Sequence, residues 1–177
     1  MAKQSKELQW FDQLPAEEPP PGSKKEADNR RQAMAYLGKH ITNTSQWVNE
    51  IAVLINADER KDLAWNALRG VLQAIRDRLT PEEAFQLSAQ LPMLIRGMFF
   101  ERYYLSGKPE KFNAEELKSR IEEALGPSPE VDPSLAFKAV LLVLRKYVSE
   151  GQLSDIYGIM PKDIRQLWDD SLKAHTA

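Results

Sequence analysis

The sequence contains no cysteine and no apolar run of membrane-spanning length. Without cysteine the chain has neither disulfides nor thiolate metal ligands, which suits a reducing compartment. Residues 1–12 are mostly polar and lack the apolar core of a secretory signal peptide. No later segment is long and apolar enough to predict a transmembrane helix. We therefore expect a cytoplasmic protein with no membrane partner.

Residues that commonly carry catalysis are scarce as well. The two histidines, His40 and His175, are far apart in the sequence, and neither has a metal-ligand spacing to a glutamate or to the other histidine. The eight glycines are scattered, so no phosphate-binding loop is indicated. No nucleophile, base and orienting group can be combined into a catalytic set. We expect no enzyme activity, no catalytic residue, no metal and no cofactor.

The chain also lacks a strong excess of charge of either sign. The formal net charge is −2, so there is no basic footprint for a nucleic-acid partner. Adjacent acids such as Glu82-Glu83 are typical of a first helical turn or a solvated face. They do not indicate a pair of catalytic carboxylates, because neighbouring side chains on a helix point in different directions.

What the sequence does have is an internal repeat. Residues 67–99 align without a gap on residues 136–168 when the chain is shifted by 69 positions. Identical residues include Ala67 with Ala136, Arg76 with Arg145, Pro92 with Pro161, and Arg96 with Arg165. This register predicts two similar halves, about 41–104 and about 112–173, related by a pseudo-two-fold axis.

The apolar pattern is helical from Asp28 onward, and prolines fall where helices begin or end. Thr80 to Glu83 forms a predicted capping box, and Ser149 to Gln152 repeats it. No segment alternates as a strand does. We expect an all-α fold, a helical bundle of about seven to nine helices. Its helices are expected near 29–40, 45–56, 59–79, from Thr80 to Leu91, 92–104, from Asn113 to Leu125, from Pro133 onward, from Ser149 to Met160, and 161–173.

Residues 1–28 differ from the rest because their prolines and charges cannot support a packed core. They contain one apolar island, around Trp10 and Phe11. These aromatics either dock on the domain or belong to a flexible tail, or they form a short linear motif for a partner. We expect a flexible or docked N-terminal tail, residues 1–28, and a single all-helical domain, residues 29–177.

Two stretches carry a resemblance to a known family. Residues 67–84 end in Thr-Pro-Glu-Glu-Ala, and residues 89–97 read Ala-Gln-Leu-Pro-Met-Leu-Ile-Arg-Gly. Together they resemble the bacterial domain-of-unknown-function family 2267. Phe99-Phe100-Glu101 stands where that family usually has Tyr-Tyr-Glu, and Arg102-Tyr103 replaces its Gly-Trp. The resemblance covers roughly residues 41–170. It implies a helical, bacterial, cytoplasmic domain and implies no reaction, because none is assigned to the family.

Two arginine pairs recur in the halves, Arg76 with Arg145 and Arg96 with Arg165. In one interpretation they surround a groove for an anion at the pseudo-two-fold axis. In the other, each guanidinium bonds helix-end carbonyls or a carboxylate within its own half. The repeat favours the structural interpretation, since a structural role is copied with the unit. The anion site requires both pairs to converge on one cavity.

The halves differ most at residues 96–104, which carry more large apolar and aromatic side chains than one buried stripe needs. Some of these side chains are expected in the core, and an exposed remainder would contact a partner or a ligand. The candidate contact residues are Arg96, Phe99, Phe100, Tyr103, Tyr104, Trp10 and Phe11.

Three functions follow from these patterns. The leading hypothesis is a non-enzymatic helical interaction module that binds itself or another cytoplasmic protein through the aromatic segment, alone or together with the N-terminal tail. The alternative is a small-molecule binding protein, with a cavity between the halves for an anionic or apolar ligand. An enzyme comes third, for lack of a catalytic set.

Overall fold

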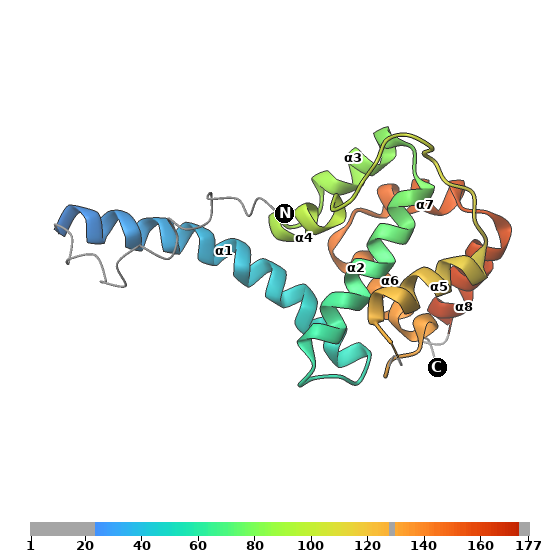
Figure 1. Cartoon of the computed structure of the whole chain (residues 1–177), viewed down its shortest axis with the longest axis horizontal. Helices are drawn as coiled ribbons and strands as arrows, with labels where there is room; N and C mark the ends of the chain where they lie inside the picture. Colours follow the sequence, from blue (N-terminus) through green and yellow to red (C-terminus); the bar gives the residue numbers. More distant parts are fainter. Residues whose placement is uncertain (1–23, 128–129, 174–177) are drawn as a thin grey trace, which may run out of the picture. The chain divides into compact units, whose positions relative to one another are not determined.

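The computed structural model describes residues 24–127 and 130–173, and these residues form eight α-helices and no β-strand (Figure 1). The expected all-α fold is confirmed. In chain order the helices are α1 (Lys24–Leu54), α2 (Lys61–Arg78), α3 (Pro81–Ala89), α4 (Met93–Phe99), α5 (Ala114–Leu125), α6 (Pro133–Tyr147), α7 (Glu150–Ile159) and α8 (Lys162–Lys173). Trp10 and Phe11 lie outside the described residues, as does most of the expected tail.

α1 is a single helix where the sequence predicted two, near 29–40 and 45–56. Polar residues stand between those two ranges. The hydroxyls of Thr42 and Thr44 each donate a hydrogen bond, at 2.9 Å, to the carbonyl four residues earlier. These side chains therefore bond within the helix instead of ending it. The helix also begins at Lys24, before the predicted start.

The described residues belong to two units that divide within α1, between Leu37 and Gly38. In the first unit, residues 24–37 are helical and the apolar side chains of Met34 and Tyr36 are exposed. The second unit begins at Gly38 and contains the hydrophobic core. The features described below all belong to the second unit.

α2 is the central helix of this unit and contacts α4, α5 and α6. Figure 1 shows it in green, with α5 and α6 beside it. Apolar residues three or four positions apart give both long helices a buried face. Burying each such side chain contributes about 1.5–3 kcal/mol. The buried faces include Leu68, Val71, Leu72 and Ile75 on α2, and Phe137, Val140, Leu141 and Leu144 on α6.

Side-chain caps begin the two short helices α3 and α7. Thr80 and Glu83 form the expected capping box, with Glu83 N donating to Thr80 Oγ1 at 3.3 Å and Thr80 N donating to Glu83 Oε2 at 2.8 Å. Ser149 Oγ accepts from Gln152 N at 3.4 Å, but the Gln152 side chain does not complete a box. Ser149 N donates instead to Gln90 Oε1 at 2.8 Å, which links α7 to the end of α3.

α4 ends at Phe99, although the sequence predicted a helix to residue 104. Two side chains of α2 bind backbone carbonyls at this end. Gln73 donates to the carbonyl of Met98 at 2.9 Å, and Arg76 donates to the carbonyls of Phe99 and Glu101. The carbonyls at a helix end need such partners, and α2 supplies them. The helix end is therefore set by tertiary contacts.

α2 and α5 cross closely at Gly70. A Cβ atom on this residue would lie 2.7 Å from Ala124 Cβ and 3.3 Å from Ile121 Cα. The first distance is shorter than two side-chain carbons tolerate, so the crossing requires glycine because of its size. These small residues allow the two helix backbones to approach each other.

Candidate functional site

The C-terminal part of α4 and the segment that follows it hold most of the predicted contact residues, and these residues differ in how deeply they are buried. Phe99 is fully buried, and Phe100 and Tyr103 are half-buried against the core. Tyr104 is 73% exposed, and the next residue, Leu105, is 62% exposed. Part of the segment is therefore core, and part of it is free to contact another molecule.

Phe85 of α3 extends the exposed apolar area of this segment. Its side chain is 58% exposed, and its ring centroid lies 5.3 Å from that of Phe100. The Phe100 ring in turn lies 5.0 Å from the buried ring of Phe99, edge to face. Phe85 and Phe100, whose rings are in contact, and the exposed residues Tyr104 and Leu105, which follow Phe100 closely in the chain, are together called the aromatic surface below.

Tyr103 separates the aromatic surface from a set of buried charges. Its ring lies 5.0 Å from the guanidinium carbon of Arg76 and 5.7 Å from Lys108 Nζ. Its hydroxyl is buried and has no hydrogen-bond partner among the described residues. Burial of the hydroxyl raises the pKa of Tyr103, because the charged phenolate loses its hydration.

Arg96 serves the packing of α3 against α4. Its guanidinium donates to the carbonyls of Ser88 at 2.8 Å and of Ala89 and Leu91 at 3.2 Å. These carbonyls lie at the C-terminal end of α3, where a cation is favoured by the exposed ends of the peptide dipoles. Arg96 is thus bound to backbone within its own half, as the structural interpretation expects.

The four repeated arginines do not share a cavity. Arg76 is 3% exposed and binds backbone carbonyls and Asp77, so it too has a structural environment. Arg145 is exposed and makes no hydrogen bond or ion pair with the described residues, and it lines a pocket of about 410 Å³ beside α7. Arg165 lies over the ring of Tyr157, at 5.9 Å from its centroid. The expected structural bonds are present for Arg76 and Arg96 and missing for Arg145.

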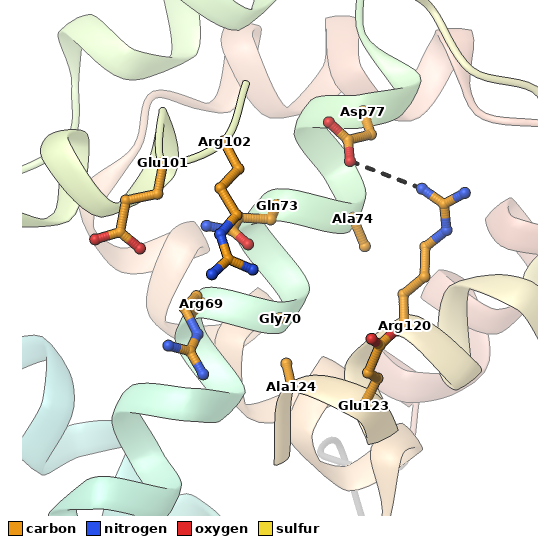
Figure 2. A pocket seen from close by; sticks show the side chains of 10 residues that line it. All are labelled: Arg69, Gly70, Gln73, Ala74, Asp77, Glu101, Arg102, Arg120, Glu123 and Ala124. Carbon is orange, nitrogen blue, oxygen red and sulfur yellow. Dashed lines mark ion pairs between the residues drawn. The ribbon is translucent and has the colours of Figure 1, made fainter. Parts of the chain in front are cut away.

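A larger pocket, of about 630 Å³, lies between α2, α5 and the segment after α4 (Figure 2). It is called the polar pocket below. Small residues of the α2–α5 crossing lie along it, and three arginines and three acids surround them. The lining residues are Arg69, Gly70, Gln73, Ala74, Asp77, Glu101, Arg102, Arg120, Glu123 and Ala124.

One side of the polar pocket is a compensated network of charges. Asp77 accepts from Arg76 at 2.9 Å and from Lys108 at 2.8 Å, and Arg120 lies 3.7 Å from its other oxygen. Arg120 also pairs with Glu110 at 2.8 Å. Each charge in the network therefore has a partner of opposite sign.

The pKa of Glu110 reflects this network. Burial alone would raise the pKa, but the hydrogen bonds and charges of Lys108 and Arg120 outweigh burial, so the pKa lies below its ordinary value. Lys108 is almost fully buried, and burial alone would lower its pKa. Hydrogen bonds to Asp77 and Glu110 outweigh burial here too, so the pKa of Lys108 is raised.

The other side of the polar pocket holds charges without such partners. Arg69 donates to the neutral side chain of Asn66 at 3.0 Å and pairs with no carboxylate of the described residues. Arg102 has no hydrogen bond or ion pair in this part of the chain, and its φ of 52° lies in the left-handed region. Glycine adopts that conformation at the least cost, so Arg102 stands at a position where the backbone favours glycine.

In the sequence, Arg102 stood out only as a departure from the family pattern, and neither Arg69 nor Arg120 was singled out. A signal was present in α2, where polar Arg69, Gln73 and Asp77 recur every four residues. That spacing places them on one face, and the face lines the polar pocket.

The described ranges contain neither a candidate metal site nor a membrane-spanning helix. No group of three or more histidine, aspartate or glutamate side chains in residues 24–127 and 130–173 is placed to hold a metal ion. In the same ranges, no helix combines the length and apolar character needed to cross a membrane.

Comparison with known proteins identifies one family. Residues 44–167 match the family described as "Uncharacterized conserved protein (DUF2267)". The match spans more than half of the chain and contains α2 to α7 in full, with both sides of the polar pocket. A search of curated proteins gave no match.

Proposed function

This chain belongs to the DUF2267 family of uncharacterised conserved proteins, and we propose that it is a non-enzymatic helical interaction module that binds a protein partner. The observation that carries this proposal is the aromatic surface of Phe85, Phe100, Tyr104 and Leu105. Three of these side chains are more than half exposed.

Exposed aromatic and aliphatic side chains contribute the most binding free energy when a partner covers them. Removing apolar area from water contributes about 25 cal/mol per Å², and aromatic residues dominate the binding energy of many interfaces. Tyr104 adds a hydroxyl that can hydrogen-bond at the rim of a contact. A partner that presents apolar side chains, including a second copy of this chain, suits this surface.

The base of the aromatic surface is well supported, which favours binding without a large cost of ordering. Phe100 rests on the buried ring of Phe99. The backbone beneath it is held by Arg76, which donates to the carbonyls of Phe99 and Glu101. The exposed residues Tyr104 and Leu105 follow this anchored turn.

Site-specific photo-crosslinking in the cells that make the protein tests the proposal. A benzophenone amino acid replaces Tyr104 in the full chain, and the matched control carries it at Val53, which is 58% exposed and outside the aromatic surface. We expect discrete protein adducts from position 104 and none of the same mass from position 53. Mass spectrometry then shows whether the partner is a second copy. Equal adducts at both positions, or none at position 104, would contradict the proposal.

Small-molecule binding is the second candidate function. The polar pocket favours it, because α2 belongs to the first expected half and α5 to the second. A cavity between the halves is where the sequence placed a ligand site. Its volume, about 630 Å³, is within the range of small-molecule sites.

We further propose that the two halves are copies of one unit related by a pseudo-two-fold axis. In α2–α4 and again in α6–α8, a long helix is followed by a short helix and then by a third helix. Thr80 caps the short helix of the first set, and Ser149 caps the short helix of the second. The contact between Gln90 and Ser149 departs from symmetry, because Ile159 occupies the position equivalent to Gln90. A crystal structure in which the halves fail to superpose would remove this part of the proposal.

A bacterial, cytoplasmic setting completes the proposal. The family resemblance supports the bacterial origin, and the cysteine-free sequence supports a reducing compartment. Fractionation of the cells that make the protein tests the location, with a cytoplasmic enzyme and a membrane protein as markers.

A further inference from the structure

We propose that the polar pocket binds the oxyanion group, phosphate or carboxylate, of a small ligand between Arg69 and Arg102. This inference rests on the second candidate function and specifies its ligand. It is independent of the aromatic surface, which uses other side chains.

The charges of the pocket indicate where an anion would bind. Arg120 and Asp77 are engaged in the buried network, so neither is free to hold a ligand. Arg69 has only a neutral partner, and Arg102 has none among the described residues. The guanidinium groups of Arg69 and Arg102, on one side of the pocket, thus have no carboxylate partner in the described part of the chain and keep donors free for a ligand.

The two guanidinium groups lie on the same side of the pocket. Figure 2 shows Arg102, from the segment after α4, extending toward Arg69 of α2, whose own side chain continues in the same direction along that side of the pocket. Like charges so arranged repel each other, and an oxyanion placed between them removes that repulsion. Each planar guanidinium can donate two parallel hydrogen bonds to one phosphate or carboxylate.

The backbone of Arg102 supports a role in binding. A side chain other than glycine pays a conformational cost at a φ of 52°, and such outliers cluster at binding sites. The conformation follows directly on the end of α4, which Arg76 fixes by its bond to the carbonyl of Glu101. Arg102 therefore starts from an anchored residue and extends into the pocket.

The remaining lining residues limit the charge of the ligand. Gly70 and Ala124 line the pocket at the helix crossing and carry no charge. The carboxylates of Glu101 and Glu123 have no cationic partner in the described ranges and stand at the pocket. They repel an extended polyanion such as nucleic acid and leave a place for a ligand with one anionic group.

Calorimetry and thermal unfolding of the full chain with inorganic phosphate test the inference, with chloride at equal ionic strength as the reference. Acetate in place of phosphate separates a carboxylate site from a phosphate site. Arg102→Gly is the informative variant because glycine relieves the backbone strain while removing the guanidinium. Arg145→Ala is the matched control, since Arg145 is also an exposed arginine without a partner in this part of the chain.

We expect saturable binding of phosphate or acetate by the wild-type protein and by Arg145→Ala. Arg102→Gly is expected to unfold at the same or a higher temperature without the anion, and to bind it at least about tenfold more weakly. The inference is overturned if the wild type binds neither anion, if Arg102→Gly binds like the wild type, or if Arg145→Ala weakens binding equally. None of these outcomes would change crosslinking at Tyr104. The anion site in the polar pocket and the protein partner of the aromatic surface can therefore be refuted independently of each other.

Discussion

Arg76 of α2 donates a hydrogen bond at 3.0 Å to the backbone carbonyl of Glu101, twenty-five residues later in the chain. This bond joins the central helix to the turn between the polar pocket and the aromatic surface. Glu101 and Arg102 face the pocket, while Tyr104 and Leu105 are exposed on the aromatic surface. One buried arginine therefore positions both candidate sites.

Arg76→Ala is expected to lower the free energy of unfolding by about 2–3 kcal/mol, because buried carbonyls and Asp77 lose a charged donor. Urea denaturation of the purified protein measures this change. Arg145→Ala, which removes an exposed arginine from the equivalent position of the repeat, should stay within about 0.5 kcal/mol of the wild type. If both variants lost the same free energy of unfolding, the contribution of the arginine would follow from its position in the repeat and not from the contacts of Arg76.

Gly70→Ala is expected to cost about 1–3 kcal/mol, because the added methyl group overlaps Ala124 at the α2–α5 crossing. Gly97→Ala is the matched control, since no atom lies within 4 Å of a Cβ at that position in α4. It should stabilise the protein by about 0.5–1 kcal/mol through helix propensity. Thermal unfolding of both variants measures these changes. If Gly70→Ala were more stable than the wild type, α2 and α5 would have to lie farther apart than the structure places them.

The beginnings of the capped helices could be predicted from sequence because their signals are local. Thr80 and Glu83 are three residues apart, so the capping box needs no tertiary information. Asn113 and Asp132 cap α5 and α6 for the same reason. Buried periodicity likewise identified α2 and α6.

Thr80→Ala is expected to cost about 1 kcal/mol, since it removes the hydroxyl that accepts from Glu83 N. Ser149→Ala should cost a similar amount, because this hydroxyl accepts from Gln152 N and from Gln90 Nε2. Ser154→Ala, at an exposed position inside α7 without a hydrogen bond in the described residues, is the control and should change stability by less than about 0.5 kcal/mol. Urea denaturation measures all three variants. If Ser154→Ala lost as much stability as Thr80→Ala and Ser149→Ala, the assignment of Thr80 and Ser149 as helix caps would be refuted.

A cavity between the halves was anticipated, but the set of side chains that line the polar pocket could not be predicted, because it depends on contacts between distant segments. Arg69 and Arg120 meet at one cavity only because Gly70 lets α5 pack closely on α2. The early end of α4 is likewise set by Gln73 and Arg76, which bind its last carbonyls from another helix. Helix periodicity contains no information on such pairings, so α4 was predicted too long.

Acid is expected to weaken the buried charge network through Glu110. Its pKa in the folded protein lies below the ordinary value of 4.5, so ionised Glu110 stabilises the fold above that pH. The contribution is lost as the pH falls through the depressed pKa. Glu110→Gln should therefore be less stable than the wild type at pH 7, and the gap should shrink as the pH falls below about 4.5. Urea denaturation of both proteins across this pH range measures the difference in their free energies of unfolding. A difference that did not change with pH would contradict the prediction.

The central claim, that a protein partner covers the aromatic surface, is tested most directly by the yield of crosslinks from position 104 in two variant backgrounds. Leu105→Asp places a charge on the surface, and Arg102→Gly changes the polar pocket next to it. We expect the adduct to be lost in Leu105→Asp and retained in Arg102→Gly, with both proteins folded by circular dichroism. An adduct that survives Leu105→Asp at the wild-type yield would contradict the claim.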